Sequence, residues 1–451
     1  MLSLSNELKI YELSLIWKET EYNFAFLDKL NKNLNWDLEY KNALNNVLKT
    51  KNIFEYYLEL KRFVALLKDG HTDVFFPQKV YDSPIYNSSL PISMAYIDGE
   101  YYVVAIKECV KGVVKEYSKI LKINDTDIHE YILKNILPYI WHEKLESCTD
   151  SLFNLLHMGK EGSIVKFLFE FDGEEYEVNL TRKFRDYSWI KQKPFSSEKY
   201  IEIYESNTHT IKLTNDNIAI IKVDSFSNCE LPKEIYSNFE MLKKAKGFII
   251  DIRNNSGGNS DNASALAALF IGNQFLSDVM KYPVHYGPFK AWSTQGSFDD
   301  KTWEDVKEEK GNSKWWEKVY KVYKHEYFEE TTSIANINNL PGKLEGPIVI
   351  LCSERTASSA ENFILYMKHH TEGIIVGNKT YGSTGLPLPI KLKSGGEFRV
   401  CTQHCYELNK DEFINKGITP NVICFNDIDD YKNRIDKVLL KGLEVIRKEC
   451  K

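Results

Sequence analysis

The amino-acid sequence predicts an α/β protein, because apolar runs typical of buried strands alternate with amphipathic helical segments from about residue 200 onward. Three of these runs are "KGFIIDIR", "GPIVILC" and "GIIVG". The first two lead through polar loops into the helical patterns "NASALAALFIG" and "SAENFILYMKHH". Residues 200–451 are therefore predicted to form a mixed β-sheet with mostly parallel strands and covering helices.

Residues 1–80 are predicted to form a helical domain. Apolar and aromatic side chains recur every three to four residues in "YELSLIWKETEYNFAFLDKL" and "NIFEYYLELKRFVALLKD", as in amphipathic helices. Gly70, in "KDGHT", ends the second pattern. His71 is therefore expected on the turn that follows.

Residues 84–190 are predicted to form a β-rich domain, with Gly and Asp turns between apolar segments. The clearest hairpin joins "VKFLFEF" to "YEVNL" through Asp172 and Gly173. The stretch from about 285 to 340 is rich in Trp, Lys and Glu and interrupts the strand–helix rhythm. We interpret it as a partly helical insertion that could cover a cleft.

Composition narrows the class of protein. The chain has 451 residues, 43% hydrophobic and 27% charged, which is ordinary for a soluble globular protein. The net charge of -6, with both signs mixed, argues against a nucleic-acid or polybasic membrane partner. No apolar run approaches the roughly 18 residues of a membrane span. The N-terminal segment lacks the apolar centre of a signal peptide, which favours a cytoplasmic location unless a leader was removed.

The cysteines do not predict a disulfide framework or a metal centre. Eight of them are scattered through a long chain. Cys401, His404 and Cys405 are close in sequence, but no second ligand pair matches them, as a structural zinc site usually requires. We expect buried or strand cysteines, no metal and no cofactor, and the oligomeric state cannot be read.

Three strand-to-helix connections carry the residues that are most suited to chemistry, since active groups collect at such ends of an α/β sheet. Gly257 and Gly258 follow a buried strand, where bare backbone N–H groups can face a ligand. Ser358 lies at a helix start, and "GNKTYGSTG" forms a third loop.

Ser358 has two interpretations. A serine at a helix start commonly caps it. A nucleophilic serine also suits this place, because the helix dipole and free N–H groups stabilise an oxyanion. The N–H groups of Ser359 and of Gly257 or Gly258 are the candidate oxyanion donors. Spacing alone leaves both interpretations open.

The ordered motifs resemble those of the tail-specific, or C-terminal processing, serine proteases. "GFIIDIRNNSGGNSDNA" resembles their buried strand and Gly loop, and "SERTASSAENFILYMKHH" their nucleophile helix, with Ser358 as the serine. "IAIIKVDSF", "GNKTYGSTG" and "FINKGITPNVIC" resemble three further motifs in the same order. The resemblance covers most of residues 217–425. It implies a ClpP/crotonase-like core and a serine peptidase acting on peptides or unfolded proteins.

The sequence departs from the bacterial members at the base. Those enzymes carry a lysine after the aromatic-Gly pair, where this chain has Ser383, and Lys379 lies on the other side of that pair. A serine without a base is a poor nucleophile. The tricorn-core-like branch uses a histidine from an upstream segment, and His71 in "DGHT" matches that expectation. We therefore predict His71 as the general base.

The remaining assignments also follow from the resemblance. In the tricorn-like branch a glutamate acts on the histidine through a second hydroxyl. Glu412 is the candidate glutamate, and Ser383 or Thr72 the candidate hydroxyl. Glu361 is expected to fix the helix start.

Residues 84–190 faintly resemble the PDZ-like domain of the same proteases, in "KGVVKEYSKILKINDTDIHEYI". Such a domain could bind an extended peptide by strand addition, and a plain β-rich spacer is the other interpretation. The function predicted for the whole chain is serine endopeptidase. The alternative is a non-catalytic binding protein on the same fold, which would need no joint presence of Ser358, His71 and the Gly pair.

Overall fold

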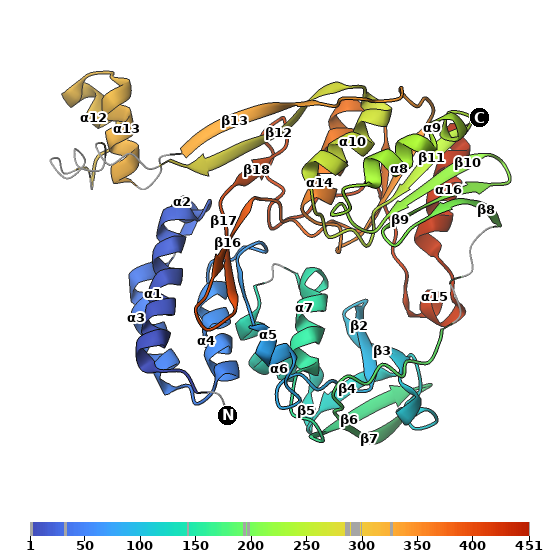
Figure 1. Ribbon diagram of the computed structural model, residues 1–451, viewed down its shortest axis with the longest axis horizontal. Helices are drawn as coiled ribbons and strands as arrows, with labels where there is room; N and C mark the ends of the chain where they lie inside the picture. The colour runs from blue at the N-terminus through green and yellow to red at the C-terminus, as the bar shows by residue number, and fades with distance from the viewer. Residues whose placement is uncertain are drawn as a thin grey trace.

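The computed structural model describes residues 3–30, 34–141, 144–192, 195, 199–284, 289, 298, 300–324 and 328–450. A helical region, a six-stranded sheet and an α/β layer follow one another along the chain (Figure 1). Among these residues, no helix is both long and apolar enough to cross a membrane.

The N-terminal region is helical, with one short strand before its last helix. Its elements are α1 (Asn6–Asn23), α2 (Leu27–Leu30), α3 (Trp36–Lys49), α4 (Ile53–Ala65), β1 (Asp73–Phe75) and α5 (Gln78–Tyr81). Asn52 caps α4, because its side chain accepts the Glu55 N–H. The apolar face of α4 is buried, as its periodicity predicts.

The second region is built on the sheet order β2-β3-β4-β6-β7, with β5 paired to β4. Its elements are β2 (Ile92–Ile97), β3 (Glu100–Ile106), η1 (Glu108–Val110), β4 (Lys119–Ile123), β5 (Thr126–Asp127), α6 (Ile128–Asn135), η2 (Leu137–Tyr139), α7 (Leu145–His157), β6 (Ile164–Phe171) and β7 (Glu174–Thr181). The hairpin between β6 and β7 turns at Asp172 and Gly173, both with positive φ, as predicted. This region has a hydrophobic cluster of its own.

The third region contains a seven-stranded mixed sheet of order β19-β15-β14-β11-β10-β9-β8. Its elements up to the insertion are β8 (Tyr200–Glu205), β9 (His209–Thr214), β10 (Ile218–Val223), α8 (Leu231–Ser237), α9 (Phe239–Leu242), β11 (Gly247–Asp251), α10 (Ser260–Ile271) and β12 (Gln274–Pro283). The elements after it are β14 (Ile348–Cys352), α14 (Ser359–His370), β15 (Ile374–Gly377), β16 (Pro387–Lys391), β17 (Glu397–Cys401), β18 (His404–Tyr406), β19 (Val422–Ile423), α15 (Ile428–Asn433) and α16 (Lys437–Glu449). The strands β10, β11, β14, β15 and β19 run parallel, as their apolar runs predict.

Both faces of this sheet are buried, which explains its continuous apolar strands. In β11, Phe248 and Ile250 belong to the cluster that includes α10 and α14. Ile249 points to the opposite cluster, which α16 covers. The connections after β11 and β14 therefore meet at one edge of the sheet.

The described part of the insertion consists of α12 (Trp303–Lys310), α13 (Lys314–Tyr323) and β13 (Phe328–Asn336). Strands β12 and β13 form a long antiparallel arm, and β18 pairs with β12. Figure 1 shows α12 and α13 at the far end of this arm, away from the rest of the molecule. Val306 and Val319 are buried between them.

Candidate active site

Ser358 lies on a strained turn between β14 and α14. Its φ of 57° and ψ of -127° fall in a region that residues other than Gly rarely adopt. The Ser358 N–H donates to the Ser383 carbonyl oxygen at 2.9 Å and lies 3.2 Å from a Glu361 carboxylate oxygen. Hydrogen bonds from two directions therefore hold the backbone of the serine in this conformation.

His71 reaches Ser358 from the N-terminal region. Strand β1 pairs antiparallel with β17, and the Thr72 hydroxyl accepts the Cys401 N–H at 3.0 Å. These contacts anchor the turn that carries His71 to the third region. Its Nε2 lies 3.1 Å from the Ser358 Oγ. The residue before His71 must be a glycine, because a Cβ on Gly70 would lie only 2.5 Å from the Tyr381 ring.

Ser383 joins the histidine to the serine turn. Its hydroxyl contacts the His71 Nδ1, while its carbonyl accepts the Ser358 N–H. These contacts fit the tautomer in which Nδ1 donates to the Ser383 hydroxyl and Nε2 accepts from the Ser358 hydroxyl. The structure thus brings Ser358, His71 and Ser383 together.

The imidazole of His71 is poised in its neutral form. Burial and, to a smaller extent, the positive charge of Arg399 lower its pKa to about 4. At neutral pH the ring therefore has an unprotonated nitrogen that can accept the proton of a hydroxyl group.

Glu361 is the carboxylate that organises this site. It is fully buried and accepts the N–H groups of Gly382 at 2.8 Å and Ser383 at 2.9 Å, besides that of Ser358. The Thr380 hydroxyl also donates to it. Burial raises the pKa of Glu361 to about 7, although these donors act in the opposite direction. Glu361 does more than fix the helix start, since it holds the loop that presents Ser383.

The two glycines differ in what they offer to an oxyanion. The Gly257 N–H already donates to the Asn255 side chain at 2.9 Å, so Gly257 is not available as the predicted donor. A Cβ on Gly257 would lie 2.5 Å from the Ser358 Cβ. The lack of a side chain at Gly257 therefore lets its backbone approach Ser358 closely. Within the described residues, the N–H groups of Gly258 and Ser359 have no hydrogen-bond partner. These two N–H groups flank Ser358 and remain candidate oxyanion donors.

Glu412 does not fit its predicted role. Its carboxylate lies 2.9 Å from His404 Nε2 and 2.7 Å from Lys29 Nζ. Its described contacts include neither His71 nor Ser383. The hydroxyl of Thr72 donates to Asp69 at 2.6 Å, so it shapes the turn and leaves the contact with His71 to Ser383.

The remaining candidates have structural contacts. The Cys401 thiol donates to the Gln403 carbonyl, and the His404 ring lies against Glu412 and Tyr406. In the described part of the chain, no group of three His, Cys, Asp or Glu residues is placed to hold a metal. Arg253 bridges Asp251 and Asp436, which ties the end of β11 to the start of α16.

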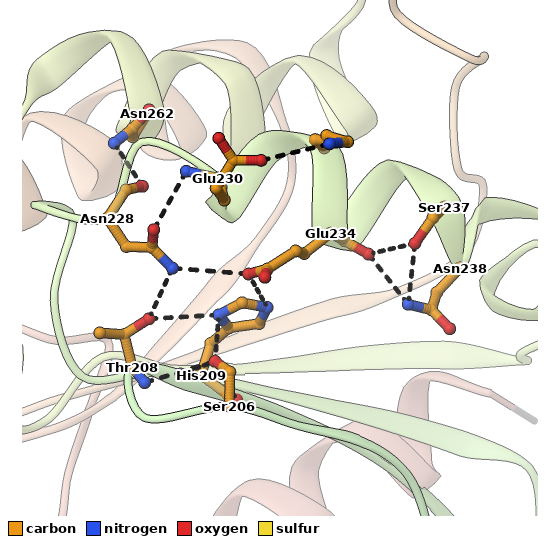
Figure 2. Close-up of polar contacts among 10 residues, drawn as sticks. Ser206, Thr208, His209, Asn228, Glu230, Glu234, Ser237, Asn238 and Asn262 are labelled. Carbon is orange, nitrogen blue, oxygen red and sulfur yellow. Dashed lines mark hydrogen bonds and ion pairs between the residues drawn. The ribbon is translucent and has the colours of Figure 1, made fainter.

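A second serine–histidine–glutamate grouping lies at the β8–β9 turn (Figure 2). Ser206 Oγ is 2.9 Å from His209 Nδ1, and His209 Nε2 is 3.6 Å from the Glu234 carboxylate. Ser206 Oγ also accepts the N–H groups of Thr208 and His209, so it caps the turn. Burial lowers the pKa of His209. This grouping is structural.

Hydrogen bonds nevertheless connect this grouping to the loop that carries Gly257 in the candidate site. Asn228 donates to the Thr208 hydroxyl at 3.1 Å, and Asn262 donates to the Asn228 carbonyl at 2.9 Å (Figure 2). Asn262 also holds the Phe226 carbonyl, and the Phe226 N–H donates to the Gly257 carbonyl. No local sequence pattern signals this network, because its contacts join segments that are distant in the chain.

Comparisons with known proteins show what the α/β core and the whole chain are similar to. Residues 217–424 match the profile of Peptidase family S41. The Tail-specific protease of Haemophilus influenzae is 23% identical over 411 residues, which cover 82% of this chain and 50% of that protein. The Probable CtpA-like serine protease of Staphylococcus haemolyticus is 23% identical over 266 residues, covering 58% of this chain and 40% of that protein. The chain thus spans about half the length of the curated relatives that it matches.

The fold is shared over the whole chain with a solved structure, mature CPAF complexed with lactacystin. The TM-score is 0.71, the match covers 99% of both chains, and the sequence identity is 14%. The helical N-terminal region and the mixed sheets are therefore parts of one fold that is shared with that structure. The α/β core of this chain is thus similar to peptidase family S41, and its whole fold is similar to that of mature CPAF.

Proposed function

We propose that this chain is a serine endopeptidase with Ser358 as nucleophile and His71 as general base. The observation that carries the proposal is the 3.1 Å contact between His71 Nε2 and Ser358 Oγ, across 287 residues of sequence. A serine that only caps a helix has no need of a half-buried, neutral histidine beside its hydroxyl.

The proposed reaction is acyl transfer to the serine and then to water. His71 Nε2 takes the Ser358 hydroxyl proton while Oγ attacks the peptide carbonyl carbon. The N–H groups of Gly258 and Ser359 stabilise the oxyanion. The imidazolium then gives its proton to the leaving amine, and the acyl-enzyme is hydrolysed by water that His71 deprotonates in turn.

Ser383 and Glu361 act as positioning residues in this proposal. The Ser383 hydroxyl fixes the imidazole tautomer and stabilises the imidazolium that forms. Glu361 fixes the backbone of Ser383 and of Ser358 at once. Base and nucleophile are therefore held in one frame, which favours the reactive geometry.

We also propose that residues 84–190 form a PDZ-like domain and that the α/β layer is a ClpP/crotonase-like core. Strand β2 is an edge of its sheet, and β2 with α7 lines a pocket of about 680 Å³ that extends to Arg355 and Asn378 of the third region. An exposed strand edge beside a pocket suits an extended peptide that adds as a strand. We propose that substrate segments bind there.

The test is covalent labelling with a fluorophosphonate probe, followed by intact mass and peptide mapping. We expect one modification, on Ser358, in wild type. It should be absent in Ser358→Ala and strongly slowed in His71→Ala. Ser206→Ala is the matched control, because it alters the structural serine–histidine grouping and should label at the wild-type rate. Persistent labelling in His71→Ala would remove His71 as the base, and an unlabelled, folded wild type would favour a binding protein.

A further inference from the structure

A second pocket of about 350 Å³ opens beside the nucleophile, where β12, β13, α10 and α14 meet. Two of its lining residues contact the serine turn directly. The Thr384 hydroxyl donates to the Ser358 carbonyl at 3.2 Å, and Ser260 Oγ lies 3.4 Å from Ser359 Oγ. The pocket therefore lies against the turn that carries the nucleophile.

The wall of this pocket is polar and acidic. Its described lining carries two aspartates, Asp261 at an exposed position and Asp278 at a buried one, and no Lys or Arg. The size suits one long side chain.

Asp278 is an acid without a cation. It is 6% exposed, and its carboxylate oxygens accept from Asn362 Nδ2 at 2.9 Å and from the Tyr366 hydroxyl at 3.5 Å. No Lys or Arg in the described part of the chain forms an ion pair with it. The Cys405 thiol is a third neutral donor to this carboxylate, which can accept about four hydrogen bonds, so the group is solvated by neutral donors alone. A buried carboxylate gains most from a partner of opposite charge.

The nearby helix starts do not turn the pocket into an anion site. The N-terminus of α10 is capped by the Asn259 side chain and carries Asp261 in its first turn. The N-terminus of α14 carries Glu361, which is fully buried. Acidic groups therefore already complement the positive ends of both helices.

We propose that this pocket is a specificity site for a basic side chain, Lys or Arg, flanking the scissile bond, with Asp278 as its counter-ion. The inference rests on the proposed peptidase function and names its substrate class. The cation would pair with the Asp278 carboxylate in place of solvent, while Met280 and Leu386 contact the aliphatic part of the side chain.

The test compares kcat/KM for peptides that differ only in one residue flanking the scissile bond: Lys, Arg, Gln or Met, varied on either side. Wild type should prefer Lys or Arg over Gln and Met. Asp278→Asn keeps the shape of the side chain and should lower kcat/KM for the basic peptides about tenfold or more. For the peptides with Gln and Met, kcat/KM of Asp278→Asn should equal that of wild type.

Asp261→Asn is the matched control, because the exposed Asp261 is screened by solvent and its loss should leave the preference nearly unchanged. Equal or better cleavage of the neutral peptides by wild type would overturn the proposal without any variant. An equal loss for all peptides in Asp278→Asn would also overturn it. Fluorophosphonate labelling of Ser358 separates the two questions: labelled protein without a basic preference refutes only the pocket, whereas unlabelled protein refutes the peptidase.

Discussion

At the scale of single residues, the direction of one hydroxyl group separates a capping serine from a nucleophile. The Glu361 N–H donates to the Ser358 carbonyl oxygen at 2.8 Å, while the Ser358 hydroxyl faces His71. The positive φ of Ser358 is a strain that the surrounding hydrogen bonds maintain. A capping role alone explains neither feature.

The histidine should work at unusually low pH. Because burial lowers the pKa of His71 to about 4, the imidazole stays unprotonated well below the ordinary value of 6.5. The second-order rate of fluorophosphonate labelling should therefore rise with pH around a midpoint near 4. Arg399→Gln should move this midpoint upward, since it removes a positive charge that disfavours the imidazolium. A wild-type midpoint at or above 6.5 would contradict the lowered pKa of His71.

Glu412 shows why the third acid was mispredicted. The resemblance pointed to a glutamate shortly before the closing "GITP" motif, and Glu412 stands there. In the fold, that carboxylate faces His404 and Lys29. Glu361 supports Ser383 instead, from a position only three residues after the nucleophile. A glutamate at that spacing has the pattern of a helix cap, so its second role is invisible in the sequence.

At the scale of elements, the loop between β15 and β16 is held by hydrogen bonds to the first turn of α14. Glu361 accepts hydrogen bonds from the N–H groups of Gly382 and Ser383 in this loop. The Ser383 carbonyl oxygen in turn accepts the N–H of Ser358. Gly382 and Gly417 approach closely there, because a Cβ on Gly382 would lie 2.6 Å from the Gly417 nitrogen. The closing "GITP" segment thus packs directly against this loop.

Replacing Glu361 tests this loop. Its folded-state pKa of about 7 lies above the unfolded value of 4.5, so its contribution to stability is full below pH 4.5 and is lost as pH rises through 7. The free energy of unfolding of wild type relative to Glu361→Gln should therefore fall between pH 5 and 8. Labelling of Ser358 should also slow, because an amide cannot accept all the donors.

Glu412→Gln is the matched control for this experiment. Burial opposes the shift, but the contacts with His404 and Lys29 hold the pKa of Glu412 at about 2. Its contribution is thus present above pH 4.5 and is lost only as pH falls through 2, so the difference from wild type should be flat between pH 5 and 8. Labelling should stay at the wild-type rate. A slowed Glu412→Gln would restore the sequence-based assignment.

At the scale of the whole molecule, the N-terminal helices and the α/β layer share one hydrophobic cluster. A buried polar network crosses the same boundary. The Glu12 carboxylate accepts the Ser394 hydroxyl at 2.8 Å, and the Gly396 N–H donates to the Tyr57 hydroxyl at 2.9 Å. The segment that carries His71 is therefore docked by packing and by hydrogen bonds at both ends of α4 and β1.

Tyr57→Phe tests this docking. It removes a fully buried hydroxyl that contacts Ser394 and Gly396, so the N–H of Gly396 loses its partner. We expect the free energy of unfolding to fall by about 1–3 kcal/mol in urea titration, with slower labelling of Ser358. Tyr11→Phe is the control, because Tyr11 is 46% exposed and should change neither quantity. Equal effects of both substitutions would argue against a structural role for the buried network.

The sequence by itself determined the buried strands β11, β14 and β15, the Asp172–Gly173 hairpin and the loops where Ser358 and His71 lie. Local periodicity and turn chemistry suffice for these features, because both depend on neighbours a few residues away. Only the tertiary structure decided that Glu361 supports Ser383, that the Gly257 N–H is occupied, and that the buried Asp278 lines a pocket beside the serine turn. Those outcomes depend on competition for hydrogen bonds and charge partners between segments distant in sequence, and that competition is settled only when the chain is packed.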